Sequence, residues 1–149
     1  MINKETQVQP AGVDLTIAEV YSFGTPGLIG FKKRELPRVV KIEPSGDMYF
    51  LERGFYKIVF NEAVYVPKDC AGICLPRSSL LRSGVSVSCA LWDPGYYGRG
   101  EALMIVGNPH GVRLEVNARV AQLVFIRVNP PPRTLYSGVY QGERLREEK

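Results

Sequence analysis

The chain has 149 residues, of which 45% are hydrophobic and 23% charged, a composition typical of one domain with a single core. The formal net charge of +4 permits an anionic ligand, but the basic residues are scattered, so the sequence argues against nucleic-acid binding. The apolar runs are too short to span a membrane and the N-terminus lacks a signal-peptide core, so we expect a cytoplasmic protein that does not bind membranes.

The cysteines indicate the redox environment. There are three, an odd number without framework spacing, which argues against a secreted disulfide scaffold and favours a reducing compartment. Cys70 and Cys74 are close in sequence, but no second ligand pair accompanies them and His110 is the only histidine. A structural zinc site would therefore be short of ligands.

Alternating apolar residues and short β-branched or aromatic runs predict strands along most of the chain. Residues 11–17 form the first expected strand, and the glycine- and proline-rich stretch 22–47 is expected to cross the surface with a strand only at 38–42. Residues 79–82 predict one helical turn, ended by Gly84. Turns are expected at Asn61-Glu62 and at 108–111, between strands at 48–51, 56–60, 63–66, 71–75, 85–91, 102–106, 112–116 and 118–128. Strands of this number and spacing predict an all-β fold, a distorted barrel or jelly roll with little helix.

The C-terminal stretch differs from the rest. Three consecutive prolines at 130–132 cannot continue a central strand, so we expect a barrel domain at residues 1–132 and a C-terminal arm and tail at 133–149. The tail either frays or closes over a phosphate ligand with Gln141, Arg144 and Arg146.

Residues 76–84 have the composition of a polyanion site. Arg77 and Arg82 can form paired hydrogen bonds to phosphate oxygens, and Ser78 and Ser79 can add hydroxyl and backbone donors. The alternative is that these side chains belong to a solvated turn.

Residues 92–100 form a second polar segment. Asp93 precedes Pro94-Gly95 and therefore sits at a turn, where a carboxylate can bind a metal or accept a proton from water. The alternative for Asp93 is a simple turn cap. Two such segments so close in sequence favour a site.

Four segments, in order, resemble the first four motifs of the dUTPase and dCTP deaminase superfamily: residues 9–15, 76–84, 93–98 and 118–123. The resemblance covers nearly the whole chain. It implies a distorted jelly roll, a homotrimer with three sites at the subunit boundaries, and Mg²⁺ carried by a deoxyribonucleoside triphosphate. It also implies that Gln122 binds substrate and that Asp14 acts on the metal indirectly.

In the dUTPase branch of the superfamily, the third motif supplies a catalytic aspartate and an aromatic ring, which correspond here to Asp93 and Tyr96. By that resemblance, Asp93 orients and deprotonates a water that attacks the α-phosphorus, and the Tyr96 ring lies against the sugar, where a ribose 2′-hydroxyl would clash. The alternative for Tyr96 is a hydrophobic residue at the barrel rim.

The deaminase branch instead needs a glutamate on the strand after the third motif. Counting from Asp93 places it at Leu103, and counting back from Asn108 places it at Ile105. Glu101 is the nearest acid, an even number of residues from either position, so it can still face the same side of a strand.

The favoured interpretation is a short archaeal-type dUTPase that hydrolyses dUTP to dUMP and pyrophosphate. A dCTP deaminase or bifunctional enzyme using Glu101 is the alternative, because residues 77–82 and the ending at 140–142 resemble the deaminase forms, and the fifth dUTPase motif is not recognisable. A non-catalytic nucleotide-binding trimer is less favoured, because such a protein needs no acid at position 93.

Overall fold

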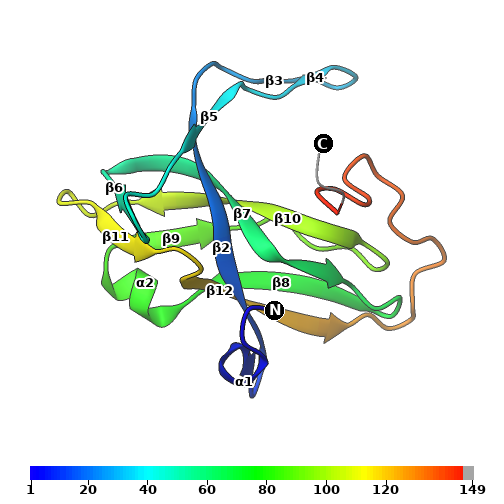
Figure 1. Ribbon diagram of the computed structural model, residues 1–149. Helices are drawn as coiled ribbons and strands as arrows, with labels where there is room; N and C mark the ends of the chain where they lie inside the picture. The colour runs from blue at the N-terminus through cyan, green and yellow to red at the C-terminus, as the bar shows by residue number, and fades with distance from the viewer. Residues whose placement is uncertain (146–149) are drawn as a thin grey trace.

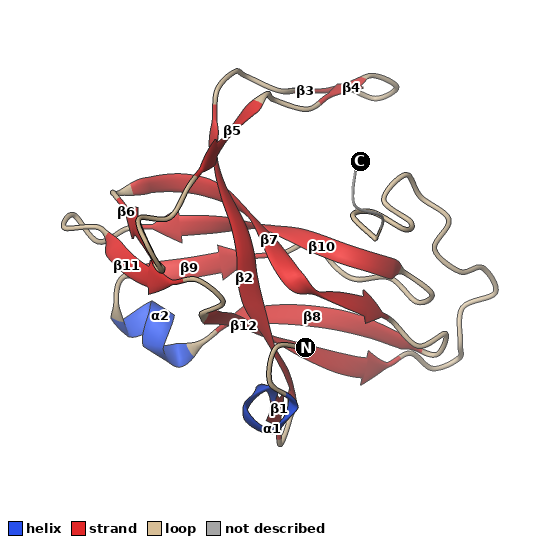
Figure 2. Ribbon diagram, in the orientation of Figure 1, coloured by secondary structure: helices blue, strands red, loops and turns tan. Residues whose placement is uncertain are grey.

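The computed structural model describes residues 1–145 and consists mainly of antiparallel strands (Figures 1 and 2). One large sheet has the strand order β8-β12-β2-β7-β10-β9, with β1 and β5 paired to β2. The elements are α1 (Lys4–Gln7), β1 (Val8–Gln9), β2 (Gly12–Phe23), β3 (Leu28–Ile29), β4 (Arg34–Glu35), β5 (Val39–Ile42), β6 (Met48–Leu51), β7 (Gly54–Tyr65), β8 (Cys70–Pro76), α2 (Ser78–Arg82), β9 (Val85–Ser88), β10 (Tyr97–Val106), β11 (Val112–Glu115) and β12 (Arg119–Arg127). The expected all-β barrel or jelly roll is confirmed.

The sheet curls until its two edge strands, β8 and β9, meet. Beyond the end of β9, an isolated bridge joins Gly72 of β8 to Trp92 through backbone hydrogen bonds of 2.8 and 3.0 Å. A Cβ at position 72 would lie 3.0 Å from the Trp92 Cβ, so the glycine allows this close approach. We call this junction of β8 with the end of β9 and the residues after it the seam of the barrel.

The core fills the inside of the barrel. Along β10, buried residues alternate with more exposed ones from Gly98 to Val106, the period-2 pattern of a strand with one face inward. Phe60, Met104 and Leu123 are among its fully buried side chains. In the part of the chain that the structure describes, no helix is long and apolar enough to cross a membrane.

The predicted turn at Asn61-Glu62 is wrong, because both residues lie inside the continuous strand β7. The Glu62 carboxylate is buried, and it accepts hydrogen bonds from Gln7 Nε2 at 2.7 Å and from the Thr16 amide and hydroxyl, each at 2.8 Å. Asn61 donates to Thr16 Oγ1 at 3.0 Å. A polar pair can continue a strand when neighbouring segments supply its partners, a condition that local sequence does not reveal.

Replacing Glu62 by leucine should destabilise the protein. The change leaves buried donors of Gln7 and Thr16 without an acceptor, each costing about 1–3 kcal/mol of unfolding free energy. Glu62→Gln keeps the side-chain shape and one acceptor oxygen and should cost less. Chemical denaturation of the parent and both variants measures the effect, and a leucine variant as stable as the parent would contradict it.

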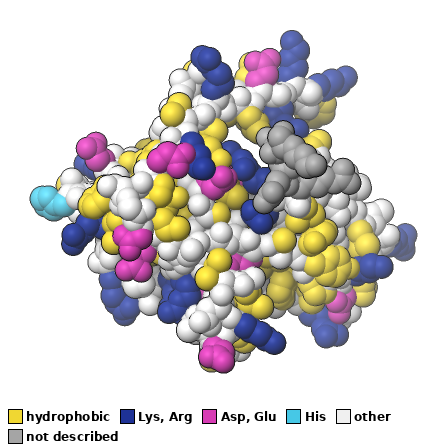
Figure 3. Space-filling model, viewed as in Figure 1, with side chains coloured by type: hydrophobic (Ala, Val, Ile, Leu, Met, Phe, Trp, Pro, Cys, Tyr) yellow, Lys and Arg dark blue, Asp and Glu magenta, His cyan; other side chains and the backbone are white. Residues whose placement is uncertain are grey.

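Several boundaries also differ from the expected ones. β9 ends at Ser88 and β10 begins at Tyr97, so residues 89–96 form a long connection at the seam. The surface stretch carries the small β3–β4 hairpin, and the short helix α1 was not expected. Lys and Arg side chains are spread over the face shown in Figure 3 rather than gathered in one patch.

The two ends of the barrel carry different segments. The helix α2 lies at one end, where it contacts β9, and the C-terminal segment returns over the opposite end (Figure 1). The predicted phosphate-binding residues of α2 are therefore at one end of the barrel, and the predicted tail residues are at the other.

Candidate active site

A cavity of about 380 Å³ opens beside the connection between β9 and β10. Most of its walls are apolar, and the ionisable groups among its lining residues are Lys57, Asp93, Tyr96, Glu101, Tyr136, Tyr140 and Glu143. The arm before β5 contributes Leu36 and Pro37 to the wall. An apolar pocket with a few converging polar groups is the usual form of a small-molecule site.

Asp93 and Tyr96 lie together in one tight turn at this cavity. The Tyr96 amide donates to the Asp93 carbonyl at 3.1 Å, and Gly95 adopts a φ of +84°, which favours glycine. Val66 pairs with the turn on both sides, donating to Tyr96 and accepting from Gly95. The predicted turn is confirmed, and the barrel wall holds it in place.

The two side chains have opposite environments. The Asp93 carboxylate is exposed at the cavity, and within residues 1–145 no side-chain hydrogen bond or ion pair engages it. The Tyr96 ring is buried edge-on against Trp92 and Tyr136. Burial raises the pKa of the Tyr96 phenol far above its ordinary value, and its hydroxyl donates to Glu143 at 2.7 Å. The turn therefore presents a free carboxylate next to a rigid aromatic wall.

The C-terminal segment packs on this same turn. Gln141 accepts from the Tyr97 amide at 3.1 Å and donates to the Gly95 carbonyl at 3.0 Å. Arg144 donates to Glu101 at 2.7 Å and to Glu19 at 3.2 Å. Gln141 and Arg144 thus hold the tail against the barrel, whereas Arg146, predicted to act with them, lies outside the described residues.

Glu101 lines the cavity, as the even offset in sequence allowed. Its Oε1 atom accepts from Lys57 Nζ at 3.0 Å and from Arg144 Nε at 2.7 Å. Lys57 also lies over the Tyr21 ring, 4.8 Å from its centre. Glu101 therefore joins β10, β7 and the tail in one ion-pair cluster.

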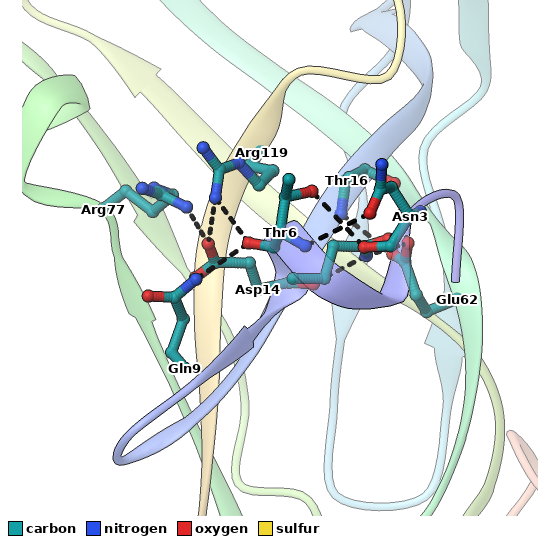
Figure 4. A network of polar contacts seen from close by, with 9 residues as sticks. Asn3, Thr6, Gln9, Asp14, Thr16, Glu62, Arg77 and Arg119 are labelled. Carbon is teal, nitrogen blue, oxygen red and sulfur yellow. Dashed lines mark hydrogen bonds and ion pairs between the residues drawn. The ribbon is translucent and has the colours of Figure 1, made fainter.

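A second polar group lies around Asp14, where the predicted residue Arg77 and the unpredicted Arg119 both approach the carboxylate (Figure 4). The Asp14 side chain is only 2% exposed and forms ion pairs with Arg77 and, at 3.2 Å, with Arg119. Burial, and then the neighbouring charge of Arg119, lower the pKa of Arg77. Gln122 stands opposite Asp14 in the β12–β2 ladder. Two guanidinium groups share one carboxylate, so a positive charge remains available to an anion.

The helix α2 extends this cationic group to the surface. It begins after Arg77, and its Leu80 is anchored in the core. Ser78, Ser79 and Arg82 are exposed. The predicted helical turn is confirmed, and its polar side chains are free to meet a ligand from outside.

The structure does not bring the two groups together within one chain. The cavity lining includes Asp93 and Tyr96 but none of the predicted phosphate-binding residues of the helix end. The helix α2 and the tail that covers the cavity lie at opposite ends of the barrel (Figure 1). If both groups act on one ligand, a second chain must supply one of them.

Sequence reasoning missed five ionisable residues of these groups: Lys57, Arg119, Tyr136, Tyr140 and Glu143. Arg119 lies inside the fourth motif-like segment, and that was the available signal in the sequence; the structure places Arg119 opposite Thr16, near Asp14, in the β12–β2 ladder. Lys57 and Glu143 reach the cavity through contacts distant in sequence. No local pattern marks them.

A comparison with known protein families assigns the chain to one of them. Residues 2–128 match the model of the family described as dCTP deaminase-like. The chain therefore belongs to the dCTP deaminase-like family, and the predicted superfamily membership is confirmed.

Curated relatives narrow the assignment within the family. The chain is 49% identical over 138 residues to the probable deoxyuridine 5′-triphosphate nucleotidohydrolase of Aeropyrum pernix, covering 93% of this chain and 87% of that protein. It is 37% identical over 143 residues to the deoxyuridine 5′-triphosphate nucleotidohydrolase of Methanocaldococcus jannaschii, covering 93% and 90%. These relatives are named as enzymes, in agreement with the expected enzyme class.

A solved structure supports the fold. The 2′-deoxycytidine 5′-triphosphate deaminase of Agrobacterium tumefaciens superposes with a TM-score of 0.61 at 21% identity. The match covers 83% of this chain and 41% of that chain. At this identity it shows a shared fold.

Proposed function

We propose that the protein hydrolyses dUTP to dUMP and pyrophosphate, with Asp93 as the general base. The observation that carries the proposal is the Asp93 carboxylate, exposed at the cavity beside the buried Tyr96 ring and unengaged by any side chain in residues 1–145. A carboxylate without a competing partner can orient a water and take its proton as that water attacks the α-phosphorus. The names of the curated relatives agree with this substrate.

Tyr96 selects the sugar in this proposal. Trp92 and Tyr136 hold its ring on two sides, and Glu143 fixes its hydroxyl. A ring held this firmly cannot move aside for a ribose 2′-hydroxyl, so deoxyribose is preferred.

Each site is shared between chains of a homotrimer. Arg77, Ser78, Ser79 and Arg82 of one chain bind the phosphates, while Asp93 and Tyr96 of its neighbour bind the reacting end. The support is the separation of the two groups within one chain and the surplus positive charge around Asp14. Gln122, beside Asp14, assists the phosphate side.

Magnesium enters with the triphosphate. Within residues 1–145 no three His, Cys, Asp or Glu side chains cluster as metal ligands, and both partners of Asp14 are cations. This donor set suits a metal that keeps its waters and its phosphate ligands, with Asp14 acting indirectly. When bound, Mg²⁺ neutralises phosphate charge.

Deamination of dCTP is the second candidate function. Glu101 does reach the cavity, yet its Oε1 atom is already bound by Lys57 and Arg144. A proton shuttle needs an oxygen that can exchange protons with water and base. The structure supports Glu101 more strongly as the anchor of the tail.

Glu101→Gln separates the two candidate functions. Purified protein is given Mg²⁺ with dUTP or dCTP, and pyrophosphate and ammonia are measured separately. We expect the parent to release pyrophosphate from dUTP and no ammonia from dCTP. The variant should retain dUTP hydrolysis with turnover lowered less than tenfold, because it loses only the two partly exposed ion pairs with Lys57 and Arg144. Ammonia release by the parent that is abolished in Glu101→Gln would establish a deaminase instead.

Removing the tail should slow the reaction without dissociating the trimer. A chain ending after Tyr136 loses the Gln141 contacts to the Asp93–Tyr97 turn and the Glu143 bond to Tyr96. We expect lower turnover, together with a sedimentation coefficient that still corresponds to a trimer of the shortened chain. Arg144→Gln, which removes a single anchor, should have a smaller effect. Unchanged kinetics after truncation would show that the tail has no part in turnover.

A further inference from the structure

Two cysteines meet at the seam of the barrel. Cys74 lies on the edge strand β8, and Cys89 is the first residue after the other edge strand, β9. Cys74 belongs to the core and Cys89 packs against it. Both therefore turn their side chains inward, beside the bridge between Gly72 and Trp92.

The two thiols influence one another directly. A hydrogen bond with the Cys74 thiol lowers the pKa of Cys89, against the effect of burial, and the same bond together with burial raises the pKa of Cys74. Two neighbouring thiols, one of which can attack the sulfenic acid formed on the other, are the usual arrangement of an oxidisable pair.

The third cysteine has a different position. Cys70 is at the other end of β8, where its thiol lies 3.6 Å from an Asp69 oxygen. Burial and the Asp69 charge raise its pKa. It supplies a natural internal control, because it shares the strand with Cys74 but not the contact with Cys89.

We infer that Cys74 and Cys89 form a reversible disulfide that staples β8 to the end of β9 across the seam. The backbone bridge between Gly72 and Trp92 already holds the two segments at strand-pair distance. The bond would close a loop that contains α2 and Arg77, next to the connection that carries Asp93. This modification site stands independently of the proposed reaction.

Hydrogen peroxide serves as the oxidant. The Cys89 thiolate attacks one peroxide oxygen, the O–O bond breaks, and the departing hydroxide takes a proton to become water. The Cys74 sulfur then attacks the sulfur of the resulting sulfenic acid, and the hydroxyl leaves with the Cys74 proton as a second water. Two thiols lose two electrons and the peroxide gains them.

Mass spectrometry of the full-length protein tests the pairing. After peroxide treatment and alkylation under denaturing conditions, one cysteine per chain, Cys70, should be alkylated, and the chain should have lost two hydrogen atoms. Peptide mapping should show a Cys74–Cys89 link that dithiothreitol removes. Alkylation of all three cysteines, or a link that uses Cys70, would overturn the inference.

Variants and thermal stability provide the second measurement. The closed loop should raise Tm of the oxidised parent by about 5 °C over the reduced form, since cross-linking restricts the unfolded chain. Cys70→Ser should keep both the link and the shift, whereas Cys74→Ala and Cys89→Ala, which suit the apolar surroundings, should lose them. A Tm equal in the oxidised and reduced parent would contradict the staple even if the link forms.

Discussion

Asp93→Asn should lower kcat for dUTP hydrolysis by a factor on the order of 10² to 10⁴, the usual cost of removing a general base. The amide keeps the shape of the carboxylate but cannot accept a proton from water. The Asp93–Tyr96 turn depends on backbone bonds, so it should remain intact. Binding of dUTP, measured by calorimetry with Mg²⁺, should change little.

A matched control separates chemistry from general charge effects. Asp47→Asn changes an exposed acid in another turn, outside the cavity lining. It should leave kcat at the parent value. An Asp93→Asn enzyme that turns over at the parent rate would remove Asp93 from the mechanism.

Arg77→Gln should lower kcat/KM for dUTP by about 10- to 100-fold, because a charge-assisted hydrogen bond to phosphate contributes about 1.5–3 kcal/mol. The variant also loses the ion pair with Asp14, but Arg119 still neutralises that buried carboxylate. We therefore expect a folded protein with a weakened phosphate site. Steady-state kinetics and the unfolding midpoint measure the two effects separately.

Mixing subunits tests whether each site spans two chains. Equal amounts of Asp93→Asn and Arg77→Gln protein are co-refolded, so that trimers contain both kinds of subunit. If Asp93 and Arg77 of one site come from different chains, about a quarter of the sites receive both parent residues and recover that share of the parent rate. Sites built within one chain would recover none.

The fold was largely predictable from local patterns. Runs such as 48–51 and 71–75 alternate or concentrate apolar residues as strands do, and Gly84, with its φ of +75°, ends the helical turn as expected. The Asn61-Glu62 prediction was wrong because the partners of Glu62 come from α1 and β2. Turn-forming residue types and buried polar pairs look alike until those partners are known.

The site was predictable where one short segment builds it. The turn from Asp93 to Tyr96 depends on Pro94 and Gly95, which the sequence displays. The Lys57–Glu101–Arg144 cluster joins three distant segments, so no spacing could reveal it. The sequence does not decide between fraying and closure of the tail, because its docking depends on bonds to backbone atoms of the turn and on side-chain pairs far apart in sequence, such as Arg144 with Glu101.

Hydrolysis of dUTP in ¹⁸O-labelled water tests the proposed reaction most directly. Attack of an Asp93-activated water on the α-phosphorus cleaves the bond to the leaving pyrophosphate and places the new oxygen on the nucleotide. We therefore expect mass spectrometry to find one ¹⁸O atom in dUMP and none in pyrophosphate, at a rate that Asp93→Asn reduces in parallel. Label in the pyrophosphate, or no dUMP formed at all, would contradict the account.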